Sequence, residues 1–228
     1  MRNKTFITVL FLFTLFPIYP GGKEEKQDMG TKDEKIVKLP KPKLKGSLSL
    51  EECIQSRRSK RSYISRPLTL EQISQLLWAA QGITDQARGL RAAPSAGALY
   101  PLELYVVKSD GVYHYKPEGH ELERLSGEDL RKPLAGAALG QESVSEAAVD
   151  IVICGVYERV TGKYGNRGVI YTHIEVGHAA QNIHLEAVAL GLGSVPVGAF
   201  QDEKVAGVLA LPKDHKPLYI IPVGYPSN

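Results

Sequence analysis

Residues 57–61 read RRSKR and place four long cationic side chains around one serine, directly after a segment with helical spacing. Guanidinium groups match phosphate oxygens in a two-pronged geometry, and a serine hydroxyl adds a short hydrogen-bond donor. The candidates for binding a small anion are therefore Arg57, Arg58, Ser59 and Arg61. Composition alone favours a solvated basic patch instead, and a nucleic-acid contact is a third interpretation.

Two further stretches combine small residues with turn-forming residues, a pattern that lets a flat ligand approach the backbone. PSAGA precedes an apolar strand pattern, and GLGSVPVGAF joins two helical patterns. The small, turn-prone residues of the first stretch are Pro94, Ser95, Ala96, Gly97 and Ala98, and in the second Gly191, Gly193 and Gly198 around Pro196 indicate a turn that another group can approach closely. The first stretch matches neither a nucleophile elbow nor a P-loop nor a dinucleotide fingerprint, so Ser95 is not predicted to be a hydrolase nucleophile.

The histidines and cysteines do not form a metal-binding pattern. His173, His178 and His184 are five and six residues apart, so they do not share a helix face as an i, i+4 pair of ligands would. Cys53 and Cys154 are far apart, and neither belongs to a CxxC motif. Cys154 lies in an apolar run and is predicted to be a buried thiol. We therefore expect no metal site.

The elements that must position these residues can be read from capping and periodicity. Ser49 with Glu52, and Thr69 with Gln72, form capping boxes that predict the starts of two helices. Apolar runs predict strands over 102–108, 112–115, 150–157 and 217–225. Small apolar residues predict a long helix over about 170–190 that packs on several sides. This order predicts an α+β domain in which helices cover both faces of one mixed sheet.

Charge and composition divide the chain into three parts. Residues 1–22 have a basic start and an apolar run, which predicts a signal peptide or an N-terminal anchor and hence an exported or membrane-anchored protein. Residues 23–46 are charged, Pro-spaced and free of aromatic residues, which predicts a flexible linker before a folded domain over 47–228. Residues 1–46 contain ten Lys/Arg and five Asp/Glu, so a total charge of +3 leaves −2 for the domain. That balance weighs against a nucleic-acid partner.

Taken in this order, the three stretches resemble the nitroreductase family of FMN flavoproteins. More narrowly they are similar to its SagB/ThcOx-type branch, whose members oxidise azolines to azoles. The resemblance extends over about residues 50–226 and rests on SRRSKRSY, PSAGALYPLELYVV, PLYIIPVGYP and the run from Lys163 to Phe200, which contains GHAAQN and GLGS. It implies a nitroreductase-like fold, an obligate homodimer with FMN at each interface, and NAD(P)H as a candidate electron donor.

The resemblance also implies roles for individual residues. Matches to the segment that holds the flavin phosphate, ribityl chain and pyrimidine edge are Arg57, Arg58, Ser59 and Arg61, and matches to a second flavin-contacting loop are Pro94, Ser95 and Ala96. Matches to the turn beside flavin N5 are Pro196, Val197, Gly198 and Ala199. Lys163 and Tyr164 match the acid/base pair of the azoline-oxidising branch, with an exposed loop as the alternative. Many relatives carry a basic tail that reaches the phosphate, and its absence here leads us to expect a heavier dependence on residues 57–61.

Several functions remain open at this stage. The leading interpretation is an FMN-dependent oxidoreductase that transfers hydride through flavin N5, with an azoline-like heterocycle, a quinone or a nitroaromatic compound as substrate. A non-catalytic FMN-binding or storage protein is the alternative. A tethered interaction protein that uses its basic arm is the third. Export would require FMN to be acquired outside the cytoplasm, because the chain has no twin-arginine signal.

Overall fold

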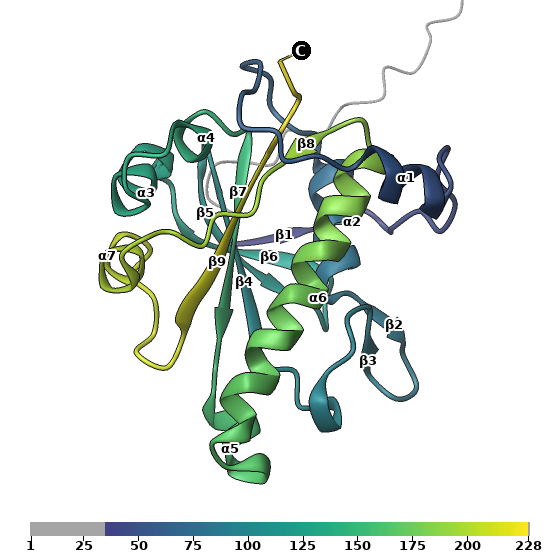
Figure 1. Ribbon diagram of the computed structural model, residues 1–228, viewed down its shortest axis with the longest axis vertical. Coiled ribbons are helices and arrows are strands. Elements are labelled where there is room, and N and C mark those ends of the chain that lie inside the picture. The colour runs from purple at the N-terminus through teal and green to yellow at the C-terminus, as the bar shows by residue number, and fades with distance from the viewer. Residues whose placement is uncertain (1–34, 228) are drawn as a thin grey trace, which may run out of the picture. The chain divides into compact units, whose positions relative to one another are not determined.

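The computed structural model describes residues 35–227, which form a seven-stranded sheet with helices on both faces (Figure 1). The strand order is β1 (Ile36–Lys38), β6 (Glu121–Ser126), β5 (Gly111–Lys116), β4 (Leu102–Lys108), β7 (Val149–Gly155), β9 (Lys216–Gly224) and β8 (Gly193–Ser194). A separate hairpin pairs β2 (Ile83–Asp85) with β3 (Leu90–Arg91). The predicted α+β architecture is confirmed.

The expectation of mixed strand pairing is wrong, because every pair of neighbouring strands in the large sheet is antiparallel. The strands β4, β5 and β6 follow one another through short turns, and such turns join antiparallel neighbours. Within residues 35–227, parallel pairing is limited to one isolated bridge between Ser59 and Ser194.

The two faces of the sheet are covered by helices from different parts of the chain (Figure 1). One face packs against α2 (Leu70–Gln81) and α6 (Arg167–Ala189), with α1 (Leu50–Ser56) beside them. The other face packs against α3 (Arg131–Ala137), α4 (Glu142–Ser145) and α7 (Asp202–Val208). The short helix α5 (Glu158–Tyr164) precedes α6, and the 3-10 turn η1 (Ala96–Ala98) precedes β4.

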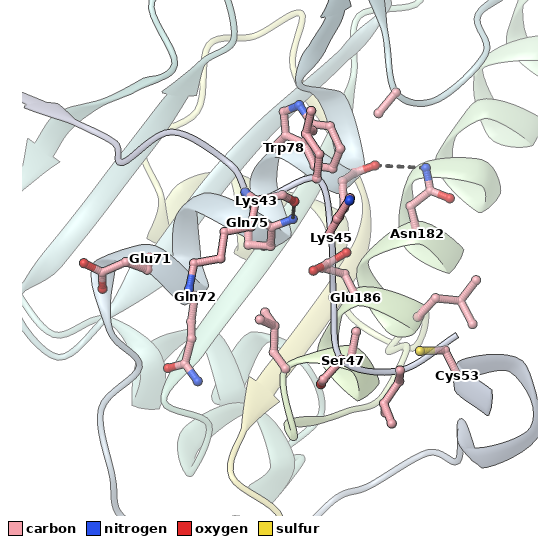
Figure 2. Close-up of a pocket in the computed structure, with 18 of the residues that line it drawn as sticks. Lys43, Lys45, Ser47, Cys53, Glu71, Gln72, Gln75, Trp78, Asn182 and Glu186 are labelled. Carbon is pink, nitrogen blue, oxygen red and sulfur yellow. Dashed lines mark hydrogen bonds between the residues drawn. The ribbon is translucent and has the colours of Figure 1, made fainter. Parts of the chain in front are cut away.

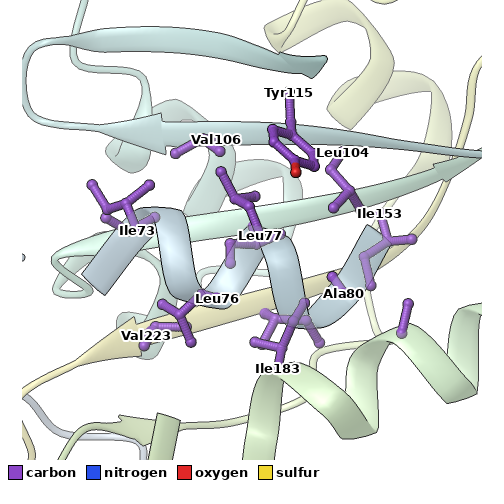
Figure 3. Close-up of a cluster of buried hydrophobic side chains, with 14 of the residues drawn as sticks. Ile73, Leu76, Leu77, Ala80, Leu104, Val106, Tyr115, Ile153, Ile183 and Val223 are labelled. Atoms are coloured by element: carbon purple, nitrogen blue, oxygen red, sulfur yellow. The ribbon is translucent and has the colours of Figure 1, made fainter. Parts of the chain in front are cut away.

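Local sequence signals account for α2, which anchors the larger core. The predicted capping box is confirmed, since Thr69 Oγ1 accepts a bond from the N–H of Gln72 and Gln72 Oε1 accepts one from the N–H of Thr69. Leu76 and Leu77 are fully buried against the sheet and α6, as Figure 3 shows. Burial of each such leucine contributes about 1.5–3 kcal/mol. Helix α2 therefore fixes α6, which carries much of the candidate site.

The folded domain begins earlier than the sequence predicted. Residues 36–38 form the edge strand β1, and Leu39 is buried in the main core. Gln75 of α2 binds the backbone of Lys43 twice, accepting from its N–H at 2.8 Å and donating to its carbonyl at 3.0 Å. The linker prediction is wrong for this part, because composition does not reveal a strand whose partner lies far along the chain. The predicted signal or anchor segment lies outside the described residues.

A carboxyl group is buried without a partner in the central strand β7. Asp150 is fully buried, and neither of its side-chain oxygens has a hydrogen-bond partner among residues 35–227. Its cross-strand neighbours are Val107 on β4 and Pro222 on β9, and neither has a polar side chain. Burial raises the pKa of Asp150 well above its usual range, and Arg131 opposes this only in part.

We expect Asp150→Val to raise the free energy of unfolding by about 1–3 kcal/mol at pH 7, because it removes an unpaired buried polar group. The gain should be smaller at pH 4. An acid whose pKa is raised in the folded state loses stability as pH rises from its unfolded pKa towards its folded pKa. Urea unfolding at the two pH values measures this, with Asp150→Asn as the polar control. A gain that is the same at pH 4 and pH 7 would contradict the prediction.

Candidate functional site

The basic segment, residues 57–61, runs along the edge strand β8 after the end of α1. The N–H of Lys60 donates to the carbonyl of Ser194 at 3.0 Å, next to the bridge between Ser59 and Ser194. Gly193 permits this approach, because a Cβ there would lie 2.7 Å from Lys60 Cβ. The backbone of the basic segment is thus attached to the sheet.

The arginines of the basic segment differ in what they bind. Arg58 Nη1 donates to the carbonyls of Gln55 at 3.0 Å and Arg57 at 2.8 Å, so this guanidinium closes the end of α1. The side chains of Arg57 and Arg61 form no hydrogen bond or ion pair with any of residues 35–227. Two guanidinium groups with all donors available fit a phosphate dianion, which requires cationic donors.

A buried histidine, His184, lies beside β8. Its place next to the basic segment was not predicted from the sequence. His184 Nδ1 lies 2.6 Å from Ser194 Oγ, and its Nε2 has no hydrogen-bond partner among the described residues. Burial, with a contribution from Arg57, lowers the pKa of His184 to about 4. The ring is therefore neutral at pH 7 and leaves the positive charge of this region to the arginines.

The predicted turn at residues 196–199 continues from β8 along β9. Val197 and Ile220 exchange two backbone hydrogen bonds, of 2.9 and 3.0 Å. Gln141 Nε2 donates to the carbonyl of Ala199 at 2.9 Å and fixes the other end of the turn. Gly198 and Ala199 are exposed, and their N–H groups have no partner among residues 35–227. The turn therefore offers free backbone donors to a ligand, and it lies on the same sheet edge as the basic segment.

The 94–100 loop, which contains the predicted residues Pro94, Ser95 and Ala96, has a strained backbone. Gly97, Ala98 and Tyr100 adopt positive φ values of 63°, 54° and 46°. Such a conformation costs about 1–2 kcal/mol for each residue other than glycine, and it is concentrated at functional sites. Ser95 Oγ accepts a hydrogen bond from the N–H of Tyr100 at 2.9 Å and closes the loop.

Helix α5 brings Lys163 and Tyr164 onto the 94–100 loop. A Cβ placed on Gly97 would lie 2.8 Å from Tyr164 Oη and 3.0 Å from Lys163 Nζ, so a larger residue at this position would displace both groups. The pair occupies the last turn of a helix and not the exposed loop that was its alternative. Lys163 is exposed and Tyr164 half-buried, so a ligand can reach both.

A buried glutamate lies near the same loop. Glu175 of α6 is 2% exposed, and its Oε1 has no hydrogen-bond partner among the described residues. Burial raises the pKa of Glu175 to about 7, although the nearby Ser95 and Gln81 act in the opposite direction. A carboxyl group with such a pKa is suited to proton transfer. The sequence analysis missed it, because one glutamate inside a helical pattern gives no signal.

Within one chain the predicted residues form two separate groups. The Lys163–Tyr164 pair lies before the amino-terminal end of α6, whereas the basic segment contacts β8 beside His184, near the other end. From Arg167 to His184 the helix rises about 25 Å at 1.5 Å per residue. One small ligand cannot contact both groups of the same chain.

The structure also contains a large cavity away from these groups and a smaller hollow near one of them. A cavity of about 1120 Å³ opens between residues 41–50, α2 and the second half of α6 (Figure 2). None of the predicted residues lines it, and the amides of Gln75 and Asn182 inside it are bonded to backbone groups. A smaller hollow of about 190 Å³ is lined by Tyr219, which Gly198 approaches. The predicted residues do not line the smaller hollow either, but Gly198 approaches Tyr219 on its wall. We place the candidate site beside this hollow, because the N–H group of Gly198 has no partner among residues 35–227.

Two classes of feature do not occur in the described part of the chain. Residues 35–227 contain no group of three or more His, Cys, Asp or Glu side chains arranged to hold a metal ion. No helix within this range is both long and apolar enough to cross a membrane.

The basic segment and the Gly198 turn thus lie on one edge of an α+β sheet that is flanked by helices. The sequence profile of the nitroreductase family matches residues 54–225. The chain belongs to the nitroreductase family and is an oxidoreductase of that family. Members of this family typically bind a flavin. The resemblance derived from the motifs is thus confirmed.

Individual relatives agree with this assignment. A protein of Methanocaldococcus jannaschii named as a nitroreductase is 47% identical over 183 residues, 78% of this chain and 91% of that protein. The microcin B17-processing protein McbC of Escherichia coli, a more distant homologue, is 29% identical over 157 residues, 63% of this chain and 57% of McbC. A solved structure named as a nitroreductase from Ralstonia eutropha has a TM-score of 0.79 and 30% identity, covering 87% of this chain and 92% of that chain.

Proposed function

We propose that the protein is an FMN-dependent oxidoreductase whose flavin lies along the β8–β9 edge of the sheet. The observation that carries this is the pair of unpaired guanidinium groups, Arg57 and Arg61, on the same edge as the free N–H groups of Gly198 and Ala199. The arginines would hold the phosphate and the turn would hold the ring edge. When bound, FMN supplies hydride transfer at its N5 atom.

Lys163 and Tyr164 are the residues we assign to proton transfer with the substrate. Their polar ends meet over Gly97, so an amine and a phenol are offered at one point of a rigid loop. A base or acid at a fixed distance from the reacting atom typically accelerates proton transfer. In the proposed reaction the lysine holds or accepts a proton and the tyrosine positions the substrate.

A homodimer would complete the site. The two groups of residues lie about 25 Å apart along α6 of one chain, so the 94–100 loop and the Lys163–Tyr164 pair would come from the second copy. An exposed apolar face of α6, with Ile170 at 47% and Ile174 at 48% exposure, is available for the contact. Sedimentation at micromolar concentration tests this, since a monomer that retains flavin would contradict it.

The substrate class follows from the relatives and remains part of the proposal. The homology to McbC supports an azoline-like heterocycle, and the nitroreductase relatives support a nitroaromatic or quinone acceptor, with NAD(P)H as electron donor. A non-catalytic FMN-binding or storage protein is the alternative.

The N-terminal segment supports export or anchoring, which cell fractionation with the full chain tests.

The absorbance spectrum of the purified protein, followed by an acceptor screen, tests the proposed function. We expect a yellow protein that NAD(P)H or dithionite bleaches and that an acceptor reoxidises over many turnovers. A yellow protein without acceptor turnover supports the storage alternative. A colourless protein that cannot be reconstituted with FMN rules out both.

A further inference from the structure

We propose that Arg159 is a positioning residue that holds the Lys163–Tyr164 pair against the 94–100 loop. Arg159 and Lys163 lie four residues apart on α5, so their side chains leave the same face of the helix. The effect expected on turnover rests on the proposed function. The effect expected on the structure of α5 does not.

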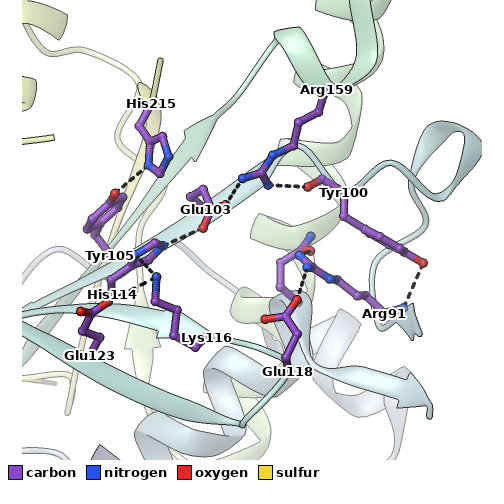
Figure 4. Close-up of polar contacts among 11 residues, drawn as sticks. Arg91, Tyr100, Glu103, Tyr105, His114, Lys116, Glu118, Glu123, Arg159 and His215 are labelled. Atoms are coloured by element: carbon purple, nitrogen blue, oxygen red, sulfur yellow. Dashed lines mark hydrogen bonds and ion pairs between the residues drawn. The ribbon is translucent and has the colours of Figure 1, made fainter. Parts of the chain in front are cut away.

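The guanidinium of Arg159 connects three elements through two hydrogen bonds (Figure 4). Its Nη1 donates to the carbonyl of Tyr100 at 3.0 Å, and its Nη2 donates to Glu103 Oε1 at 2.5 Å. One side chain thereby joins α5 to the 94–100 loop and to β4. A planar fork can satisfy two acceptors in different directions at once, which a lysine ammonium on a flexible stem does less well.

Tyr100 is the point at which the loop is held. Its N–H donates to Ser95, its carbonyl accepts from Arg159, and its hydroxyl accepts from the N–H of Arg91 at 3.1 Å. All three polar groups of this residue are therefore bonded while its φ is 46°. A strained conformation persists only where the surroundings hold it. Loss of the Arg159 contact would free the 94–100 loop at Tyr100. Gly97 in the same loop lies against the Lys163–Tyr164 pair, so the pair would lose its fixed support.

The other partner of Arg159 is itself fixed in place. Glu103 Oε2 lies 2.6 Å from His114 Nε2, whose Nδ1 lies 2.8 Å from Lys116 Nζ, and the His114 ring stacks on Tyr105 at 4.6 Å (Figure 4). Burial acts to raise the pKa of Glu103, but hydrogen bonds from His114 and Arg159 outweigh it and lower the pKa to about 2. With such a pKa the carboxylate is charged at neutral pH, so Arg159 has an anionic partner there.

The test replaces Arg159 and follows α5 in two ways. Arg159→Lys keeps the charge but not the fork, and Arg159→Ala removes both bonds. We expect faster hydrogen exchange of the backbone amides of residues 158–165 in both variants. We also expect turnover to fall about 10- to 100-fold with KM and FMN absorbance little changed, because small displacements of reacting groups have effects of this size.

A matched control and a double variant separate the possible causes. Arg88 forms a similar arginine–carboxylate pair with Asp85 on the β2–β3 hairpin, so Arg88→Lys should change neither exchange in 158–165 nor turnover. If Arg159 acts through Lys163, Arg159→Lys should cause no further loss of turnover in a Lys163→Ala background. Glu103→Gln, which weakens the same link from the strand, should reproduce the faster exchange if Arg159→Ala fails to fold.

The outcomes distinguish this proposal from the proposed function. Unchanged exchange of α5 in Arg159→Lys and Glu103→Gln overturns the positioning role, whatever the activity. An undiminished loss of turnover in the Lys163→Ala background also overturns it. Faster exchange in the Arg159 variants together with a silent Lys163→Ala supports the positioning of α5 and contradicts the catalytic assignment of Lys163.

Discussion

Replacing Lys163 by alanine is expected to lower turnover by about 100- to 10,000-fold, the range that a positioned acid or base typically contributes. The amine lies over Gly97 together with the Tyr164 hydroxyl, so its removal takes away one of the two groups that we assign to the proton-transfer step. FMN content and KM should change little, because neither group belongs to the basic segment or to the Gly198 turn. Steady-state kinetics with the acceptor identified in the screen measures the effect.

Tyr164→Phe isolates the hydroxyl, because it keeps the ring that packs at 5.2 Å against Tyr171. A smaller loss than for Lys163→Ala is expected if the tyrosine positions and the lysine transfers the proton. Lys204→Ala on α7 is the matched control, since this lysine is also exposed and its helix packs on the face of the sheet opposite to α6. Full turnover in both site variants would contradict the assignment of Lys163 and Tyr164 to proton transfer.

The second large effect is expected on the affinity for FMN. Arg57→Ala and Arg61→Ala should each raise the dissociation constant about 10- to 100-fold, since a charge-assisted hydrogen bond contributes about 1.5–3 kcal/mol. Both side chains have all their donors available in the protein, so the substitutions break no internal bond. Fluorescence titration of the apoprotein with FMN measures the constants without any assay of activity.

Lys60→Ala is the control within the same segment, because it removes the same charge. The side chain of Lys60 is exposed, and only the backbone of this residue bonds to Ser194. We expect its affinity for FMN to stay within about threefold of the parent, the effect of one screened surface charge. Losses of equal size in all three variants would mean that general charge attraction, and not a phosphate site at Arg57 and Arg61, accounts for binding.

The parts of the fold that were predictable are those determined by neighbouring residues. The capping boxes at Ser49 and Thr69 are both confirmed, because each closes through bonds three residues apart. The central strands β4, β7 and β9 were visible as apolar runs, because both of their faces are buried. Strand β1 was missed, because none of its three residues is buried and only pairing with β6 makes them a strand.

The residues of the candidate site could be predicted from the sequence, but their arrangement in space could not. The basic segment and the Gly198 turn were both marked by their composition, yet only the structure shows them on one edge of the sheet. The contact of Lys163 and Tyr164 with Gly97 joins segments far apart in the sequence, which no local pattern can indicate. His184 and Glu175 were missed because their chemistry depends on burial, which their helix positions alone did not reveal.

Strand β1 also has a consequence for how molecules of this protein meet. It covers the outer side of β6, whose backbone N–H and C=O groups would otherwise form an open sheet edge. An open edge is a template on which a strand of another molecule can add, and this is a common route to aggregation. Residues 36–38, which composition predicts to be part of a flexible linker, therefore protect the edge of β6 from such pairing. A chain shortened to begin at Ser47 would keep every candidate site residue and lose that protection.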